Sequence, residues 1–566
     1  SQASDFDALI ETQEVSLEKN PITAEEVDRA RQQILKGRDE VLANSQQFAI
    51  SLSDWAGCGD WRLFFLHRDR LEKVTPADVN RVAQKYLIRS NRTLGIYNPT
   101  KKPERAEVPE TPDLAKLMDG YKGREAMSAG EEFDPTPANV EARVQRGKIG
   151  DVEYAFLTKK TRGETVQFTA SLRFGNLDSF KGTGEAADFV GPMLLRGTKT
   201  KNRQQIKDEL DKLKASVGIN SSTGAISISG QTKKANLPAV LALLREILRE
   251  PSFPESEFEI LKREELEGLE KGRTDPQTLA TIALRRKVSP YPADDVRYTP
   301  TVDEAIDRIK KTTLDQVKAL YAEQVGGVGQ LAIVGDFDPA AAKKELGTIF
   351  DGWTAKVPYR RIEKPVQKVA GGDERIDTPD KANAVYVAAL PLPVQDTDPD
   401  YPALVVGNYI LGGAPLASRL SNKVRGKEGL SYGVGSQVMG SPIEKNGQFL
   451  TFAIANPKNV PKLETVMAAE LKKFLDEGVT EKELDEAKKA YLQAQKGRRA
   501  SDASLAQMLA TAMYAGRTFD YYDQHEKGIE NLTPAAVKSA FDKYVDPKNL
   551  NLVIAGDLKK SAEEKK

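Results

Sequence analysis

The feature that most constrains the fold of this chain is internal repetition. Residues 22–31 (ITAEEVDRAR) are similar to residues 479–488 (VTEKELDEAK), and residues 74–86 (VTPADVNRVAQKY) are similar to residues 532–544 (LTPAAVKSAFDKY). The first pair is offset by 457 positions and the second by 458. Such a constant offset indicates a repeated structural unit. A weaker third copy occupies residues 253–336.

Each copy ends in the same order, with a long charged helix, two further helices and a short apolar strand, which falls at residues 94–99 in the first copy. Thr23 and Thr480 each begin a capping box, with a glutamate three residues later, which satisfies free amides in the first turn of a helix. Thr75 and Thr533 each precede a proline. Proline is favoured at the first helical position because the amide hydrogen that it lacks would make no hydrogen bond within the helix there. These signals predict equivalent helix starts in the first and last copies.

The second and third copies also have a first half. Residues 150–174, 383–392 and 431–454 alternate in hydrophobicity like paired strands. Residues 204–216 and 402–411 are predicted helices between them. The sequence therefore predicts an α+β protein made of tandem repeats, each an antiparallel sheet packed with helices, in about two and a half copies. The first copy lacks its strand-rich half.

Composition excludes several classes of function. Among 566 residues, 83 Lys and Arg balance 83 Asp and Glu, and this neutrality argues against nucleic acid as the main partner. The most apolar stretch, residues 401–417, contains Asn408, two prolines and three glycines, so no membrane span is expected. The single Cys58 excludes an intrachain disulfide. Two histidines, His67 and His525, are few for a metal enzyme, and they lie at equivalent positions of the repeat.

Two segments resemble a known family, the pitrilysin/insulysin zinc metallopeptidases, or inverzincins, whose signature is H-x-x-E-H. Residues 411–434 (LGGAPLASRLSNKVRGKEGLSYGV) resemble the signature of the family's even repeats. Residues 171–198 (SLRFGNLDSFKGTGEAADFVGPMLLRGT) resemble the stretch that houses the zinc motif in its catalytic repeat. The resemblance implies a hydrolase of the insulinase family, of bacterial type, acting in proteolysis.

Members of this family carry four α+β repeats in two halves that close around a peptide. The resemblance implies that residues 1–100 are the second half of repeat two, 101–145 the linker, 146–358 repeat three and 359–566 repeat four. The linker assignment agrees with the Pro- and charge-rich composition of residues 101–113. We therefore expect a partner for this chain, either a missing N-terminal segment or a separate zinc-bearing subunit.

The zinc motif is degenerate in this chain. In the matching window Asp188 stands in the place of the first histidine, Gly191 in that of the general base and Pro192 in that of the second histidine. Proline cannot ligate a metal and glycine cannot accept a proton. We expect no metal or other cofactor in this chain, and zinc only in the completed enzyme.

Arg425 and Tyr432 are the candidate catalytic residues. Their spacing places Arg425 near a helix C-terminus, Gly429 at a helix stop and Tyr432 at the start of a strand. Taken alone, this pattern is also typical of a surface arginine and a half-buried strand tyrosine. The resemblance implies that both side chains reach the zinc site, where the guanidinium orients a substrate carbonyl and the phenol donates to the developing oxyanion.

Two functions follow. In the first, the chain is the C-terminal part of a zinc endopeptidase that encloses and cleaves peptides, and it is inactive by itself. In the second, it is a non-catalytic subunit or peptide-binding scaffold paired with a zinc-bearing subunit. Because half an α+β repeat leaves strand edges and helix faces bare, the half-repeat favours the first. Bacterial relatives imply a periplasmic or exported location.

Overall fold

The computed structural model describes residues 19–87, 114, 118–121 and 128–562. They form two compact units. One unit comprises Ser1–Glu131 with Lys160–Thr165 and Lys207–Ser216, and the other contains the remaining residues. The predicted strand at residues 94–99 and most of the predicted linker lie outside the described residues. The repeat boundaries proposed from the sequence stay predictions.

The first unit is built from helices in its N-terminal part. They are α2 (Ala24–Ala43), α3 (Ser45–Gly57), α4 (Leu63–Leu71) and α5 (Pro76–Tyr86). The predicted starts are confirmed: Thr23 forms a capping box with Glu26, and Thr75 caps α5 with a proline at the first position. The ring of Phe48 on α3 meets Phe64 and Phe65 on α4 at 6.0 and 6.2 Å, edge to face. No residue of α3 is buried.

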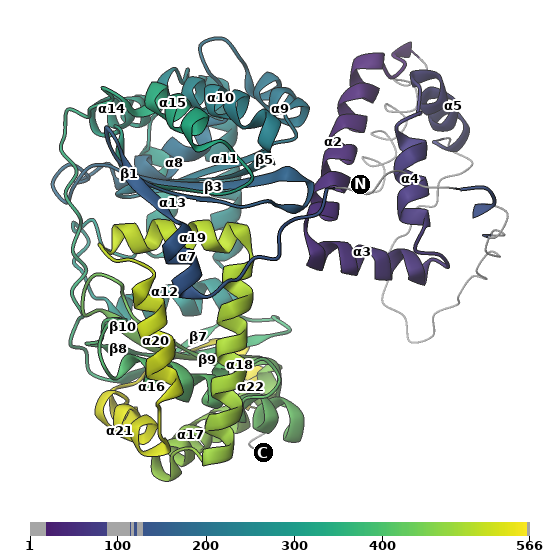
Figure 1. Ribbon diagram of the computed structural model, residues 1–566. Coiled ribbons are helices and arrows are strands. Elements are labelled where there is room, and N and C mark those ends of the chain that lie inside the picture. The colour runs from purple at the N-terminus through teal and green to yellow at the C-terminus, as the bar shows by residue number, and fades with distance from the viewer. Residues whose placement is uncertain (1–18, 88–113, 115–117, 122–127, 563–566) are drawn as a thin grey trace. The chain divides into compact units, whose positions relative to one another are not determined.

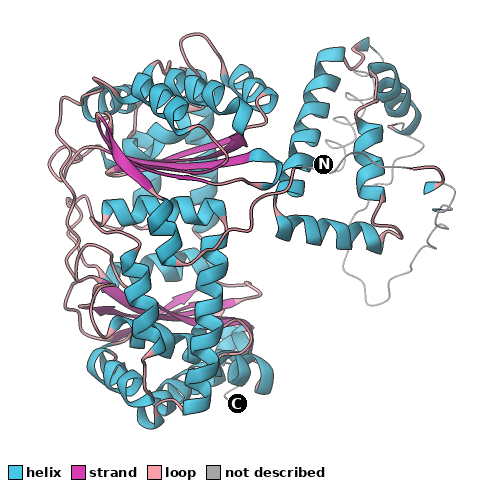
Figure 2. Cartoon of the chain, viewed as in Figure 1, coloured by secondary structure: helices cyan, strands magenta, loops and turns pink. Residues whose placement is uncertain are grey.

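The second unit contains two mixed β-sheets (Figures 1 and 2). The first sheet has the order β1-β2-β6-β3-β5-β4 and the second has the order β7-β11-β8-β10-β9. The strands are β1 (Gln145–Ile149), β2 (Asp151–Thr158), β3 (Thr165–Arg173), β4 (Ser216–Ser222), β5 (Ala225–Lys233), β6 (Val328–Gly335), β7 (Gly372–Asp377), β8 (Ala384–Leu392), β9 (Ser431–Met439), β10 (Gly447–Ala455) and β11 (Asn551–Gly556).

Helices cover both sheets. The α-helices of this part of the chain are α7 (Pro137–Arg143), α8 (Gly184–Leu194), α9 (Arg203–Lys212), α10 (Leu237–Arg249), α11 (Glu255–Gly272), α12 (Pro276–Val288), α13 (Val302–Lys311), α14 (Leu314–Gln324), α15 (Pro339–Phe350), α16 (Tyr401–Asn408), α17 (Val460–Glu477), α18 (Glu481–Ala500), α19 (Asp502–Tyr514), α20 (Asp520–Glu530), α21 (Pro534–Tyr544) and α22 (Leu558–Ala562). Thr480 forms the predicted capping box of α18, and Thr533 caps α21 with Pro534 at its first position.

The predicted α+β class is confirmed, but the sheets are not purely antiparallel. In the first sheet β2 pairs in parallel with β6, and in the second β11 pairs in parallel with β7. The expected pairing within residues 150–174 is wrong, because β6 lies between β2 and β3. A strand that returns after a run of helices can enter the middle of a sheet, and a parallel pair requires such a long connection. The paired strands expected in residues 431–454 are confirmed as β9 and β10.

The two sheets exchange a helix. The chain makes α12 between β5 and β6 of the first sheet, yet α12 packs on β8 and β11 of the second, where Ala280 and Leu284 meet Val387 and Val553. Conversely, α19 is made between β10 and β11, and its Leu505 packs on the first sheet. Figure 1 shows α12 and α19 in the layer between the sheets. Each sheet therefore depends on a helix from the other part of the chain for one covered face.

Among the described residues, none of the helices has both the length and the apolar character that a membrane span requires. The strands of the sheet centres are instead buried from both sides. In β8 every residue but Pro391 is buried, as expected for a strand with helices on both faces.

Candidate functional site

The degenerate zinc window forms the middle of α8, and Gly191 is the point at which this helix touches β4. The amide of Gly191 donates to Ser221 Oγ at 2.7 Å. A β-carbon on Gly191 would lie 2.5 Å from the carbonyl carbon of Asn220. Such a contact is closer than real β-carbons allow, so a longer side chain at this position requires the strand to move. The place of the family's general base is thus closed by the backbone of β4.

Pro192 removes a backbone hydrogen bond from the same turn of α8. It lacks an amide hydrogen, so the carbonyl of Asp188 has no donor from within the helix. Ser221 Oγ stands beside this turn, 2.5 Å from the carbonyl oxygen of Ala187, to which it donates, and 3.3 Å from that of Asp188. Pro192 offers no atom that could bind a metal. The residues present therefore do not fit zinc, and within the described part of the chain no group of His, Cys, Asp and Glu could hold a metal ion.

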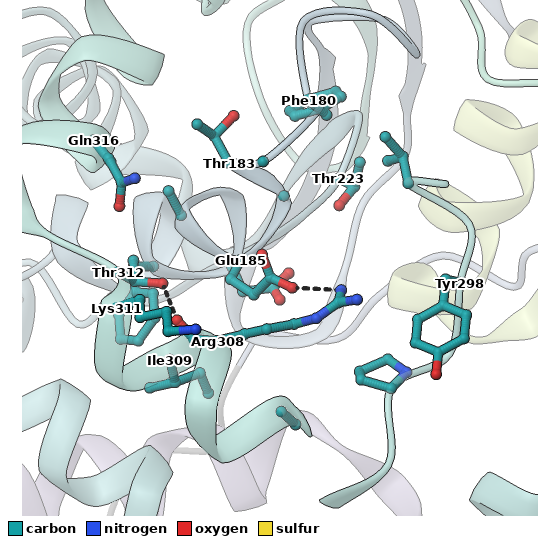
Figure 3. A pocket seen from close by; sticks show the side chains of 18 of the residues that line it. Phe180, Thr183, Glu185, Thr223, Tyr298, Arg308, Ile309, Lys311, Thr312 and Gln316 are labelled. Carbon is teal, nitrogen blue, oxygen red and sulfur yellow. Dashed lines mark hydrogen bonds and ion pairs between the residues drawn. The ribbon is translucent and has the colours of Figure 1, made fainter. Parts of the chain in front are cut away.

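A cavity of about 1020 Å³ opens beside α8, with walls from α11, α13 and the turn between β4 and β5. Figure 3 shows its polar lining, including the ion pair between Glu185 of α8 and Arg308 of α13. The two side chains are 2.9 Å apart, and the Arg308 guanidinium lies 5.2 Å from the ring of Tyr298. This ion pair joins the two helices across the cavity.

Asp188 is the unusual acid of this cavity. Asp188 is exposed toward the cavity, yet the surrounding walls reduce the hydration of its carboxylate. This desolvation, together with the charges of Glu185 and Glu265, raises the pKa of Asp188 to about 7. The carboxyl group therefore changes charge near neutral pH. Sequence reasoning treated Asp188 only as a lost zinc ligand, although the spacing of three residues from Glu185 indicated two acids on one helix face.

A second cavity of about 480 Å³ shares Asp188, Thr223 and Val296 with the first. Its character is opposite, because the chain lines it with cations from the end of β3, from the loop after α12 and from the segment between the two sheets. These are Arg173, Arg297, Arg361 and Lys364. The two neighbouring cavities therefore differ in charge: acidic side chains outnumber basic ones in the lining of the first, and basic side chains outnumber acidic ones in that of the second.

The structure confirms the predicted local setting of Arg425 and Tyr432. Arg425 lies in a π-helical turn, Ser421–Lys427, which follows a first π-helical turn at Tyr409–Gly413. Gly429 ends this segment in the left-handed region with φ +62°, and β9 begins two residues later. Short π-helical segments occur often at functional sites.

A β-bulge determines where Tyr432 points. Gly433 pairs with Ile454, and Ser431 pairs with the next residue of β10, so Tyr432 is the extra residue of the bulge. Ser431 Oγ accepts from the amide of Gly433 at 3.1 Å and donates to the carbonyl of Ile454 at 2.6 Å, which holds the bulge in shape. The side chain of Tyr432 is 65% exposed, so the half-buried alternative is wrong. Bulges commonly re-aim a side chain in this way.

Arg425 is exposed as well. In the described part of the chain neither Arg425 nor Tyr432 makes a hydrogen bond or ion pair, and neither lines the two cavities beside α8. The structure thus places both on the surface of one short segment and leaves both polar groups available. Their catalytic role stays a prediction.

The two histidines pack against aromatic rings at equivalent places. His67 of α4 lies 5.5 Å from Trp55, and His525 of α20 lies 5.8 Å from Tyr401 and 5.9 Å from Tyr521. Burial is the main cause that lowers the pKa of His525 to about 4. His525 is therefore neutral at physiological pH and serves packing.

Two domains of a known protein family match parts of this chain. Residues 179–287, which include α8, match the Insulinase (Peptidase family M16) domain, and residues 312–491, which include Arg425 and Tyr432, match the Peptidase M16 inactive domain. Two parts of the chain thus match M16-family domains, and the resemblance to pitrilysin-like proteins is supported at that level.

The relatives include both hydrolytic and non-hydrolytic proteins. The chain is 23% identical over 401 residues to a protein named "Non-peptidase homolog YmxG" of Helicobacter pylori, over 68% of this chain and 88% of that protein. A peptidase M16 inactive domain from Pseudomonas fluorescens has the same fold, with a TM-score of 0.65 at 23% identity, covering 73% of this chain and 98% of that one. The periplasmic protease PqqL of Escherichia coli is similar with a TM-score of 0.58 at 14% identity, covering 97% of this chain but 62% of PqqL.

Proposed function

We propose that this chain is the non-hydrolysing part of an M16 peptide-binding chamber. In this proposal the H-x-x-E-H zinc site belongs to a further M16 segment or to a partner subunit. The closed position at Gly191 supports the absence of hydrolytic chemistry beside α8, and the match of residues 312–491 to an M16 inactive domain supports a non-hydrolysing role for that part of the chain. An exported, periplasmic location is part of the proposal, since PqqL is described as a periplasmic protease.

The exposure of α3 supports the proposal that a further M16 segment or a partner subunit packs against this chain. The fifth residue is alanine in each of the equivalent helices α3, α12 and α19. Ala280 and Ala506 are 0% and 1% exposed because their helices cover sheets, whereas Ala49 is exposed and α3 has no buried residue. A helix whose two counterparts cover sheets, but which covers none among the residues that the structure describes, is suited to dock on the sheet of another α+β repeat.

Arg425 and Tyr432 are the groups that this chain would bring to the completed chamber. An exposed guanidinium can hold a peptide carbonyl with planar, paired donors. A phenol can donate to the oxygen that becomes negative in a tetrahedral intermediate. Support comes from the bulge that exposes Tyr432 and from the absence of any competing partner in the described residues. The fold likeness to 62% of PqqL, a longer protease, also supports this assignment.

A scaffold without any part in chemistry is the second candidate. It is favoured by the similarity to the non-peptidase homologue YmxG, 88% of whose length is matched by this chain. In that case Arg425 and Tyr432 would bind peptide or nothing. The reading frame before Ser1 and the neighbouring genes, searched for H-x-x-E-H, identify the protein with which the chain is to be tested.

The deciding experiment is hydrolysis of a fluorogenic peptide by the chain together with its zinc-bearing complement. Tyr432→Phe removes only a hydroxyl from an exposed ring, so stability is expected to stay unchanged. Loss of an oxyanion donor lowers kcat by about 10²-fold or more. Tyr86→Phe, which changes another largely exposed tyrosine, is the matched control. Equal kcat/KM of Tyr432→Phe and wild type would assign the chain to the scaffold function.

A further inference from the structure

The basic cavity next to Asp188 is not explained by a zinc peptidase or by its complement. It lies where the end of β3, the loop after α12 and the segment that leads into the second sheet come together. Arg173 ends β3, Arg297 belongs to the loop, and Arg361 and Lys364 belong to the connecting segment. Four cations from three separate parts of the chain thus line one cavity of about 480 Å³.

The chain neutralises only part of this charge. Arg297 pairs with Asp295 at 2.7 Å, and Arg361 pairs with Glu444 at 3.0 Å. Within the described residues, no carboxylate lies at ion-pair distance from Arg173 or from the amino group of Lys364. Two of the four cations, Arg173 and Lys364, therefore have no carboxylate partner in an ion pair. Asp188 lies on the wall that this cavity shares with the first.

Aromatic side chains fix Arg173 in place. Its guanidinium carbon lies 3.7 Å from the ring centre of Tyr514, and Tyr514 Oη is 3.3 Å from Tyr359 Oη. Burial and the contact with Tyr514 raise the pKa of Tyr359, so Tyr359 offers a hydroxyl group rather than a charge. Arg173 Nε donates to Gln330 Oε1 at 3.5 Å. A guanidinium stacked on a ring keeps its other in-plane N–H groups for hydrogen bonds, which is the geometry that a planar oxyanion needs.

We infer that this cavity binds a carboxylate of an acidic peptide. Arg173 would donate hydrogen bonds to the carboxylate in the plane of the guanidinium. Lys364 would add a positive charge at the exposed side of the cavity, and the hydroxyl groups of Tyr359 and Tyr514 would supply neutral donors. The choice of a peptide as the carrier of the carboxylate rests on the proposed function, whereas the anion site rests on the cavity alone. The carboxylate comes either from an aspartate or glutamate side chain or from a C-terminus, and both have the same chemistry.

Fluorescence anisotropy with a labelled hexapeptide containing two glutamates tests the inference on the 1–566 chain. The same peptide with glutamines, and a third with an amidated C-terminus, separate side-chain from terminal carboxylates. Arg173→Gln and Lys364→Gln are each expected to weaken binding of the acidic peptide by about tenfold, the scale of one charge-assisted hydrogen bond. Arg173→Lys tests the need for the planar group, because it keeps the charge.

Lys344→Gln is the matched control, since it removes one exposed charge from α15 outside the cavity. It is expected to change the affinity less than twofold, and thermal unfolding of every variant checks the fold. Equal binding of the acidic and glutamine peptides, unchanged by the variants, would overturn the anion site and leave the peptide chamber standing. Absence of binding for all peptides would contradict the chamber itself, so the two failures are distinguishable.

Discussion

Ala280 and Ala506 occupy the same position of equivalent helices, and each is buried on the sheet whose strands come from the other part of the chain. The exchange is reciprocal, so neither sheet has a complete core of its own. Side chains from α12 meet Val387 and Val553 of the second sheet, and side chains from α19 meet Ala332 and Val334 of the first.

This relationship predicts unequal effects of one substitution at two equivalent sites. Ala506→Asp places a carboxylate without a partner against an apolar sheet and should lower the free energy of unfolding by more than about 3 kcal/mol. Ala49→Asp makes the same change on exposed α3 and should change stability by less than about 0.5 kcal/mol. Urea unfolding followed by circular dichroism measures both. Similar losses for the two variants would show that α3 is already docked in this chain.

The close contact between α8 and β4 predicts that Gly191→Ala is destabilising. The added methyl group meets the backbone of Asn220, and overpacking of this kind costs about 1–3 kcal/mol. Gly268→Ala in α11 is the matched control, because nothing lies within 4 Å of a β-carbon there. That variant should gain about 0.5–1 kcal/mol from reduced backbone freedom. A neutral or stabilising Gly191→Ala variant would mean that the place of the general base is open after all.

Asp188→Asn should increase the free energy of unfolding at pH 8 relative to wild type. The folded pKa of about 7 lies above the unfolded value of 3.8, so the folded protein binds the proton more tightly between these values. Wild-type stability therefore falls as the pH rises through this window, while asparagine cannot ionise and avoids the loss. The difference should be small at pH 3.5, grow up to about pH 7 and then stay constant.

Urea unfolding at pH 3.5, 5, 6 and 8 measures this difference. Asp307→Asn, which changes an exposed carboxylate of α13 outside the cavity, is the control and should show no such rise. A difference between Asp188→Asn and wild type that does not depend on pH would contradict the raised pKa.

Purified 1–566 should hold no stoichiometric zinc and should not hydrolyse peptides. The reason is the ligand set at Asp188, Gly191 and Pro192, which offers one carboxylate where a zinc site needs three protein ligands. Elemental analysis after dialysis gives the metal content, and a chelator should leave the unfolding temperature unchanged. One tightly bound zinc per chain, or a fall of that temperature with the chelator, would contradict the prediction.

Arg425→Lys tests the other candidate residue in the completed enzyme. Lysine keeps the charge but loses the planar pair of donors, so a raised KM is expected together with a reduced kcat. Because Arg425 is exposed and unpaired in the described residues, the unfolding temperature should not change. Unaltered steady-state kinetics would place Arg425 outside the active site.

Local features could be predicted from the sequence, and non-local ones could not. The caps at Thr23 and Thr480 depend on residues three positions apart, and the structure confirms them. The insertion of β6 between β2 and β3 depends on strands more than a hundred residues apart, and no periodicity in either segment encodes it. The exchange of α12 and α19 could not be predicted for the same reason, because the apolar face of a helix does not indicate which sheet the helix covers.

The candidate site shows the same division. The helix end at Gly429 and the strand start before Tyr432 followed from residue types, but the exposure of Tyr432 arises from a bulge that only the pairing with β10 reveals. The degenerate motif was evident in the letters Asp188 to Pro192. The raised pKa of Asp188 could not be predicted from the sequence, because it depends on Glu265 of α11 and on the walls of the cavity.

Because of the exchanged helices, the first sheet cannot complete its core until late in the synthesis of the chain at the ribosome. β6 is complete at Gly335, but α19, which covers it, does not start until Asp502. At 5–20 residues per second, the first sheet waits on the order of ten to thirty seconds with Ala332, Val334 and Leu157 uncovered. During that interval the nascent chain presents an apolar sheet face to the cell, and a chaperone that shields this face would act before residue 514 leaves the exit tunnel.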